Sequence, residues 1–263
     1  MEKITAMIPA GNEADNIVEA VKSVLWADEV YVVVDESSAD GTYELAKSAS
    51  PDIRVEKHEY GYSAKQKNWA IPRASHPWIF LLDADERPDR RLVDAVKKAL
   101  ENPACDAYEV KRRNVFLGRA LKSGGLQNDR VIRLFRKECF YEDKRVHAEV
   151  KGYKKLGSLA GRLEHHTFKD WNSYLIKLHR YSKWGAEQAL IGGQKAGFVN
   201  VVLRPIHRFI KQYFLRLGFL DGIPGAVNAY LGAYSVFLKY TLLHELKREP
   251  GKKIEGEIFK AEG

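Results

Sequence analysis

The stretch "WIFLLDADERPD" at residues 78–89 decides the fold and raises the question of function. Its first five residues are apolar strand formers, and four of the next five are charged, with Asp83 and Asp85 separated by one alanine. A continuous apolar run predicts a strand buried on both faces, as in a parallel sheet. Because adjacent like charges repel, the paired aspartates suggest that a cation lies at the strand end. Alternatively, Asp85 caps the following helix and Asp83 is solvated.

The segments before this stretch alternate between strand and helix patterns. Strands are expected at residues 4–9, 29–35 and 53–58, each followed by apolar residues at helical spacing. Asp40 is expected to cap the helix of residues 43–49. Repeated strand-helix units predict an α/β fold with an open, mostly parallel, Rossmann-like sheet flanked by helices. Ligands bind such sheets beyond the carboxyl ends of the strands, where Asp35, Asp83 and Asp85 lie.

The rest of the chain has a different pattern. Strands with polar outer faces are expected at about residues 105–165, and helices follow from residue 168. Residues 203–217 place aromatic and aliphatic side chains on one helix face and cations on the other. The sequence therefore predicts an α/β domain at residues 1–165 and a basic, amphipathic helical region at residues 166–263.

The composition narrows the class of partner. The chain has 43 Lys and Arg against 35 Asp and Glu, a formal net charge of +8. This surplus favours an anionic partner: nucleic acid, an anionic membrane or a phosphorylated substrate. The two cysteines lack metal-ligand spacing, which argues against a zinc site and for a reducing compartment. The N-terminus lacks a signal-peptide pattern, and the uncharged stretch 222–238 is shorter than the roughly 20 residues of a membrane span.

Ordered segments along the chain carry a family resemblance. They are "IPAGNE" (8–13), "VVVDESSADGT" (32–42), "SAKQKNWAI" (63–71), "FLLDADE" (80–86), "RVIRLFRK" (130–137), "RVHAEV" (145–150) and "LRPIHRFIKQYFLRLGFLDGIPGA" (203–226). In this order and spacing they resemble the inverting GT-A glycosyltransferases of family 2. Within that family they are most similar to the lipopolysaccharide core β-glucosyltransferases, which carry a DADE box. The resemblance extends over nearly the whole chain.

The resemblance implies roles for residues at the first two strand ends. Pro9, Ala10 and Asn12 correspond to the loop whose backbone approaches the nucleoside, and Glu13 lies beside them. Asp35 corresponds to the aspartate that accepts a hydrogen bond from the nucleotide base. From the residues alone, the alternatives are that Asp35 is a turn aspartate and that Glu13 is an acid favoured by the helix dipole.

The resemblance also implies how the diphosphate and the metal are bound. Lys67 and Asn68 correspond to a basic-Asn pair near the nucleotide or diphosphate, although a solvated lysine is the alternative and Lys65 is a second candidate. Asp83 is implied to reach the ribose or the metal. Asp85 is implied to coordinate Mg²⁺ or Mn²⁺ that bridges the two phosphates, which would offset the crowded negative charge.

Inversion needs a general base on the acceptor side of the sugar. The resembling branch has a Val-His-Glu box, whereas this sequence has one inserted alanine at residues 146–149. Because strand side chains alternate faces, the insertion leaves Glu149, Glu142 and Asp143 as competing bases. His147 is a candidate for binding diphosphate or acceptor, with a packed structural histidine as the alternative.

Two adjacent histidines, His165 and His166, invite a metal-site interpretation. Adjacent side chains on a strand point to opposite faces, and the sequence offers no clear third ligand. The residues therefore argue against a metal site there. The resemblance implies that one of them lines the acceptor or phosphate side.

The implied activity is transfer of a sugar, glucose by the resemblance, from a UDP-sugar to a glycolipid such as lipopolysaccharide core. The implied location is cytoplasmic, peripheral at the inner face of the membrane, where the 203–217 helix would lie in the interface. That helix would otherwise pack on the α/β domain or on a second subunit of a homo-oligomer. Two other classes are a basic nucleic-acid-binding α/β protein and a sugar nucleotidyltransferase. The cations are spread rather than gathered in a stripe, and no glycine-rich phosphate loop follows the first strand.

Overall fold

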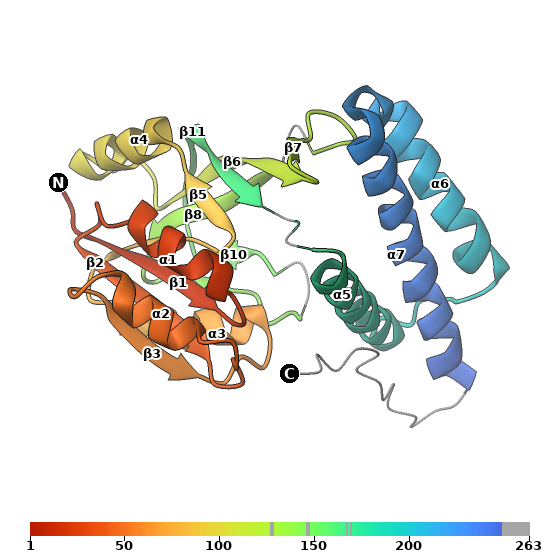
Figure 1. The fold of residues 1–263 in the computed structure, drawn as a ribbon, viewed down its shortest axis with the longest axis horizontal. Coiled ribbons are helices and arrows are strands. Elements are labelled where there is room, and N and C mark those ends of the chain that lie inside the picture. Colours follow the sequence, from red (N-terminus) through yellow and green to blue (C-terminus); the bar gives the residue numbers. More distant parts are fainter. Residues whose placement is uncertain (127–128, 146–147, 167, 169, 249–263) are drawn as a thin grey trace. The chain divides into compact units, whose positions relative to one another are not determined.

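The structure is a computed structural model that describes residues 1–126, 129–145, 148–166, 168 and 170–248. The chain divides into two compact units. Unit 1 comprises residues 1–113 and 128–166, and unit 2 comprises residues 114–127 and 167–263. Each unit is described by itself (Figure 1).

The first half of unit 1 is a parallel sheet, which confirms the expected α/β architecture. Its strands are β1 (Ile4–Ala10), β2 (Glu29–Asp35), β3 (Arg54–His58) and β4 (Trp78–Leu81), in the order β3-β2-β1-β4. The helices α1 (Ala14–Ser23), α2 (Thr42–Ala49) and α3 (Ser63–Ala70) connect them, and the short helix η1 (Ile71–Arg73) extends α3. The carboxyl ends of β1, β2 and β4 therefore lie at one edge of the sheet.

Antiparallel strands continue the same sheet and make it mixed. They are β8 (Arg130–Arg136), β6 (Ala107–Phe116), β11 (Leu156–His166) and β5 (Glu86–Pro88), and the order onward from β4 is β8-β6-β11-β5. Two short strands, β9 (Phe140–Tyr141) and β10 (Val150–Lys151), form a separate hairpin, and β7 (Arg119–Ala120) pairs with the end of β6. The pairing of β5 with β11 returns the chain beside the DADE turn.

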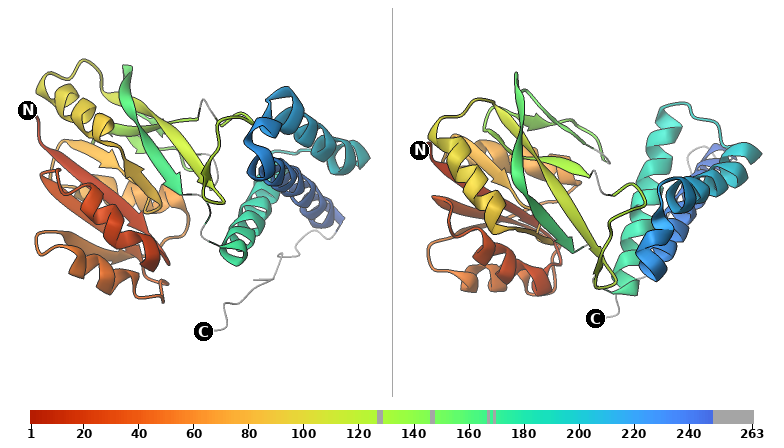
Figure 2. Two further views of the ribbon diagram at one scale, coloured as in Figure 1. Left: turned by 45° about the horizontal axis from the view of Figure 1, so that its top comes forward. Right: turned by 90° about the horizontal axis from the view of Figure 1, so that it is seen from above.

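Both faces of the sheet are covered by apolar side chains, as the buried run of β4 requires. Helices α1, α2 and α4 (Arg90–Glu101) pack on one face, where Ile17, Ala46 and Val96 join the core. Helix α3 and the β9-β10 hairpin pack on the other, through residues such as Ala64 and Tyr141. Figure 2 shows these layers from two further directions. The edge of the sheet at which β1, β2 and β4 end lies between these two layers.

The expected capping role of Asp40 is wrong. Helix α2 begins at Thr42 with Gly41 at the N-cap, in the left-handed conformation (φ 83°). The Asp40 carboxylate instead accepts hydrogen bonds from the backbone N–H of Thr42 (3.1 Å) and of Ala14 at the start of α1 (2.9 Å). Asp40 therefore ties the starts of two helices together, a contact between distant segments that local sequence spacing does not report.

Unit 2 is mostly helical. Its elements include α5 (Trp171–Ile191), η2 (Val199–Leu203), α6 (Arg204–Ile210), η3 (Lys211–Leu215), η4 (Gly218–Asp221) and α7 (Gly222–Arg248). Helices α5 and α6 both pack on α7, and a small core forms around Ala186, Tyr240 and Leu243. No helix among the described residues has the length and apolar character needed to cross a membrane.

Candidate active site

A buried network of charges fixes the turn between β4 and β5. Asp83 Oδ1 lies 3.1 Å from Lys67 Nζ of α3, and Arg133 of β8 donates to Asp83 Oδ2. The same guanidinium lies 2.7 Å from Glu86 Oε1. Lys67, Arg133 and Glu86 are 7%, 4% and 0% exposed. Two elements distant in sequence, α3 and β8, therefore hold the Asp83 carboxylate by charge-assisted hydrogen bonds.

Opposite charges decide the protonation states in this network. Burial raises the pKa of Asp83, but Arg133 and Lys67 outweigh it and hold the pKa well below its usual range. Burial lowers the pKa of Lys67, but the Asp83 carboxylate and Tyr141 together outweigh burial, so the net shift of this pKa is upward. Both groups are therefore charged at neutral pH.

Asp85 lies two residues further on and has a different environment. Its residue is 8% exposed, and its Oδ2 atom lies 3.4 Å from Nε2 of His165 on β11. The backbone carbonyl of Asp85 accepts a 2.9 Å hydrogen bond from the N–H of His166. The β5-β11 pairing, with His165 opposite Glu86, produces this juxtaposition. One carboxylate and one imidazole thus meet at the end of the turn.

Asp35 and the first loop form the neighbouring part of the sheet edge. The Asp35 carboxylate accepts hydrogen bonds from Ser37, through its backbone N–H (3.1 Å) and hydroxyl (2.8 Å), and from the Tyr60 N–H (3.3 Å). A Cβ atom on Gly11 would lie 3.2 Å from Asp35 Cβ, so the glycine lets the β1-α1 loop approach the carboxylate closely. These contacts agree with the turn interpretation of Asp35, and they also fix the carboxylate at the strand end.

The β1-α1 loop is held by side chains of the next loop. Pro9 and Ala10 are the last residues of β1. Asn12 has a positive φ of 54°, its N–H donates to Ser38 Oγ (2.8 Å), and its Oδ1 accepts from the N–H of Ala39 (3.1 Å).

Glu13 occupies the N-cap position of α1. Its side chain accepts a hydrogen bond from Asn16 Nδ2 (2.7 Å). The carboxylate therefore lies beside the first turn of α1, where the helix dipole favours negative charge.

The three candidate residues on α3, Lys65, Lys67 and Asn68, have different partners in the structure. Lys67 joins the Asp83 network, whereas Lys65 is exposed and lies 3.6 Å from Glu59. Asn68 bonds both backbone groups of Tyr141, donating to its carbonyl (2.8 Å) and accepting from its N–H (2.7 Å). Asn68 therefore fixes the β9 strand, and the ammonium of Lys67 lies 5.2 Å from the centre of the Tyr141 ring. The hairpin is thus held beside the buried network.

The candidate bases lie on or beside this hairpin. Glu142 and Glu149 lie 3.8 Å and 2.8 Å from Lys151 Nζ, and Glu142 also lies 2.8 Å from Lys144 Nζ. A hydrogen bond from Lys144 lowers the pKa of Glu142. Asp143 accepts a hydrogen bond from the Tyr62 hydroxyl.

Glu142, Asp143 and Glu149 lie on one segment of the chain, and none of their carboxylates belongs to the network around Asp83. His147, the remaining candidate, lies outside the described residues.

The side chains at this turn fit a divalent cation only if a bound substrate supplies further oxygen ligands. Asp83 has one oxygen on Lys67 and the other on Arg133, whereas Asp85 has His165 as its neighbour. Among the residues that the structure describes, no group of three or more His, Cys, Asp or Glu is placed to hold a metal. Mg²⁺ bound by one or two protein ligands and substrate phosphates needs no such group. Asp85 is therefore the better placed of the two aspartates.

Sequence reasoning missed Arg133, and it offered His165 only as one of two histidines that the resemblance implies on the acceptor or phosphate side. Arg133 is a single cation in the apolar strand "VIRLF" of residues 131–135, and that position is a usable signal for a buried charge. Local spacing did not reveal the contact of His165 with Asp85, because that contact depends on the pairing of β11 with β5. Glu86, fully buried, was read only as part of the DADE box.

Comparisons with known proteins identify the family of the chain. The family described as Glycosyl transferase family 2 matches residues 5–156. The lipopolysaccharide core biosynthesis glycosyltransferase LpsC of Rhizobium meliloti (strain 1021) is 28% identical over 94% of this chain and 95% of its own length. An uncharacterized glycosyltransferase of Rickettsia typhi, RT0209, is 26% identical over 98% of this chain and 92% of its own length.

Solved structures with a similar chain path include S. aureus TarS 1–349, at 15% identity and a TM-score of 0.49, over 96% of this chain and 93% of that one. The matched family segment runs from β1 to the first residue of β11 and includes the whole β4-β5 turn. The chain is a GT-A type glycosyltransferase of family 2.

Proposed function

We propose that this enzyme inverts the anomeric centre while it transfers a sugar, glucose by resemblance, from a UDP-sugar to a glycolipid of the lipopolysaccharide core type. The observation that carries the proposal is the β4-β5 turn, where Asp85 is placed beside His165 and Asp83 is held by Lys67 and Arg133. The lipopolysaccharide relative supports the acceptor class. This family assignment replaces the nucleic-acid-binding and nucleotidyltransferase alternatives that the net charge left open.

Different residues along the sheet edge would bind different parts of the donor. Asp35 and the Pro9–Glu13 loop would bind the nucleoside, with the Asp35 carboxylate accepting from the imide N–H of uracil. Asp85, with His165, would hold Mg²⁺ or Mn²⁺, which when bound neutralises charge on the departing diphosphate. Lys67 would add positive charge near the same phosphates, and its pairing with Asp83 fixes its position.

The transfer itself is a single displacement. The acceptor hydroxyl oxygen bonds to the anomeric carbon while the bond from that carbon to the diphosphate oxygen breaks, and UDP leaves. A carboxylate of the hairpin, Glu149, Glu142 or Asp143, takes the hydroxyl proton. All three lie on the segment that Asn68 fixes next to α3.

Unit 2 is proposed to bind the enzyme to the cytoplasmic face of an anionic membrane. Large apolar side chains are exposed along its helices, including Phe198 (73%), Ile206 (52%) and Phe214 (53%), and Lys211 and Arg216 lie among them. Apolar side chains interspersed with cations are typical of interfacial helices.

Sedimentation with anionic and with neutral vesicles tests the membrane proposal. The wild type should bind the anionic vesicles, and the double variant Phe198→Asp and Phe214→Asp should not. Equal binding of wild type and variant would contradict it.

Donor identity tests the reaction class. Purified enzyme with Mn²⁺ should be stabilised against heat by one UDP-sugar more than by other nucleotide sugars, and should slowly hydrolyse that sugar without an acceptor. Omission of Mn²⁺ is the control. Equal thermal shifts with every nucleotide sugar, and no release of UDP, would overturn the proposal.

A further inference from the structure

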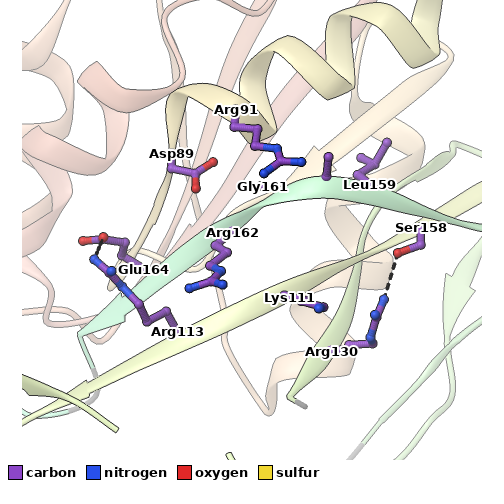
Figure 3. Close-up of a pocket in the computed structure, with 11 residues that line it drawn as sticks. Asp89, Arg91, Lys111, Arg113, Arg130, Ser158, Leu159, Gly161, Arg162 and Glu164 are labelled. Carbon is purple, nitrogen blue, oxygen red and sulfur yellow. Dashed lines mark hydrogen bonds and ion pairs between the residues drawn. The ribbon is translucent and has the colours of Figure 1, made fainter. Parts of the chain in front are cut away.

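A concave site separate from the candidate active site lies in unit 1, on the sheet beyond the β4-β5 turn. It is a cavity of about 580 Å³ formed by the start of α4 and by β6, β8 and β11. That volume is in the range of small-molecule sites. Figure 3 shows its side chains, with Asp89 and Arg91 on the α4 side of β11. It contains none of the residues assigned above to donor binding or catalysis.

Positive charge dominates this cavity. Its described lining includes two acids, Asp89 and Glu164, and five cations: Arg91, Lys111, Arg113, Arg130 and Arg162. Figure 3 shows Arg113, Arg162, Lys111 and Arg130 following one another across the strands. Like charges gathered in a hollow raise the local positive potential, which favours an anionic ligand.

The acids neutralise only part of this charge. Arg113 pairs with Glu164, and Arg130 lies 2.6 Å from Glu109 and donates to Ser158 Oγ at 2.8 Å. Asp89 is the N-cap of α4, where its carboxylate accepts from the N–H of Leu92 (2.7 Å).

Three cations remain after these pairs. In the part of the chain that the structure describes, Arg91, Lys111 and Arg162 form no ion pair, and all three are exposed. The cavity therefore keeps three unpaired cations.

One wall of the cavity is closely packed. Gly161 of β11 has a φ of 90°, and a Cβ atom there would lie 2.3 Å from the Leu92 nitrogen and 2.6 Å from Asp89 Oδ1. Only glycine allows β11 to approach α4 so closely. The cavity thus has a fixed wall and is not merely a group of mobile surface cations.

The cavity lies next to the active site along β11. Glu164 of the cavity and His165 beside Asp85 are successive residues, and successive strand side chains point to opposite faces. A ligand here would not compete with the diphosphate for Asp85. It would contact a second part of a large substrate.

We infer that this cavity binds a phosphate-bearing sugar of the acceptor, an inference that rests on the proposed function. Guanidinium groups pair with phosphate in bidentate geometry, and the Ser158 hydroxyl suits a sugar hydroxyl. The described lining has few apolar side chains, Leu159 and Ala160 among them, and this argues against a lipid chain as occupant. The enzyme thus recognises a charged group of the acceptor away from the sugar that accepts the transfer.

Binding of glucose 6-phosphate, with glucose as the uncharged comparison, tests the inference. Calorimetry should show the wild type binding glucose 6-phosphate at least tenfold more tightly than glucose. The double variant Lys111→Met and Arg162→Met should lose that preference. A control variant, Arg90→Met and Lys98→Met, removes two exposed cations outside the cavity and should keep it.

Two further measurements separate the possible failures. UDP-sugar hydrolysis without acceptor should stay within twofold in the cavity variant, because donor residues are untouched. Sugar phosphate binding that is equal in wild type and cavity variant overturns the inference while hydrolysis persists. Cavity substitutions that abolish binding to anionic phospholipid vesicles and leave glucose 6-phosphate binding unchanged also overturn it, in favour of a lipid headgroup. Absence of hydrolysis in the wild type counts against the proposed function instead.

Discussion

Glu86 of the β4-β5 turn and Glu149 of the β9-β10 hairpin are both paired with a cation, but they differ in burial. Glu86 of the turn has a side chain with 0% exposure and is paired with Arg133. Glu149 of the hairpin has a side chain with 70% exposure and is paired with Lys151. Both pairs join a carboxylate to a cation at almost the same distance, 2.7 Å and 2.8 Å.

This difference in burial bears on what each region is able to do. Buried charges persist only when each is compensated, and removal of one partner leaves another charge unpaired in the interior. Exposed pairs contribute about 1 kcal/mol or less and exchange partners readily. Under the proposed function, the turn would therefore be a fixed frame for metal and diphosphate, and Glu149 or Glu142 would exchange a lysine for a substrate hydroxyl.

Replacement of the general base should have the largest effect. Glu149→Gln, Glu142→Gln and Asp143→Asn each remove one candidate carboxylate with little change in shape. One of them should lower kcat by about 10²–10⁴-fold, because that is the usual contribution of general-base catalysis. Steady-state transfer assays measure it, and UDP affinity serves as the control. Full activity in all three variants would exclude the hairpin as the source of the base.

Loss of the buried cation should have the next largest effect. Arg133→Met leaves Asp83 and Glu86 without their shared partner, so the free energy of unfolding should fall by about 3–5 kcal/mol. Arg130→Met, on the same strand, removes an exposed cation and should cost about 1 kcal/mol or less. Urea denaturation compares the two. Equal losses would remove the distinction between buried and exposed pairs.

The same contrast predicts how stability depends on pH. Because the pKa of Asp83 is depressed in the folded state, its stabilising contribution is present above the unfolded pKa of about 3.9. That contribution disappears as the pH falls through the folded-state pKa. Urea midpoints from pH 7 to 3 should therefore fall less steeply in Asp83→Asn than in the wild type. Parallel curves would show that Asp83 is not the group responsible.

The smallest effect is expected at an exposed lysine. A hydrogen bond from Lys144 lowers the pKa of Glu142, so Lys144→Met should raise that pKa. If Glu142 is the base, the acidic limb of the kcat profile should move to higher pH. If Glu149 or Asp143 is the base, the limb should stay in place. The profile thus sharpens the assignment that the first set of variants makes.

The sequence predicted the half of the fold that depends on local pattern. The strands and helices of the first hundred residues follow from apolar runs and helical spacing, and the strand-end positions of Asp35, Asp83 and Asp85 follow with them. Local spacing does not reveal which strand returns beside the turn. The contact of His165 with Asp85 needs the β5-β11 pairing, and the role of Arg133 needs β8 to lie next to β4.

The limited reach of local spacing also explains why the sequence did not distinguish the roles of Lys67 and Asn68. The resemblance grouped Lys67 with Asn68, and both project from one short helix. Their different partners, Asp83 and the Tyr141 backbone, come from segments 16 and 73 residues away. Contacts over such separations are set by tertiary packing, which a single sequence does not encode in its spacing.

Calorimetric titration of UDP in the presence and absence of Mn²⁺ tests the central claim most directly. The claim is that Asp85 holds the divalent cation that binds the diphosphate. The wild type should bind UDP at least tenfold more tightly with Mn²⁺, Asp85→Asn should lose this dependence, and Asp94→Asn, at an exposed position on α4, should retain it. An Asp85→Asn variant with an unchanged, Mn²⁺-dependent affinity for UDP would contradict the account.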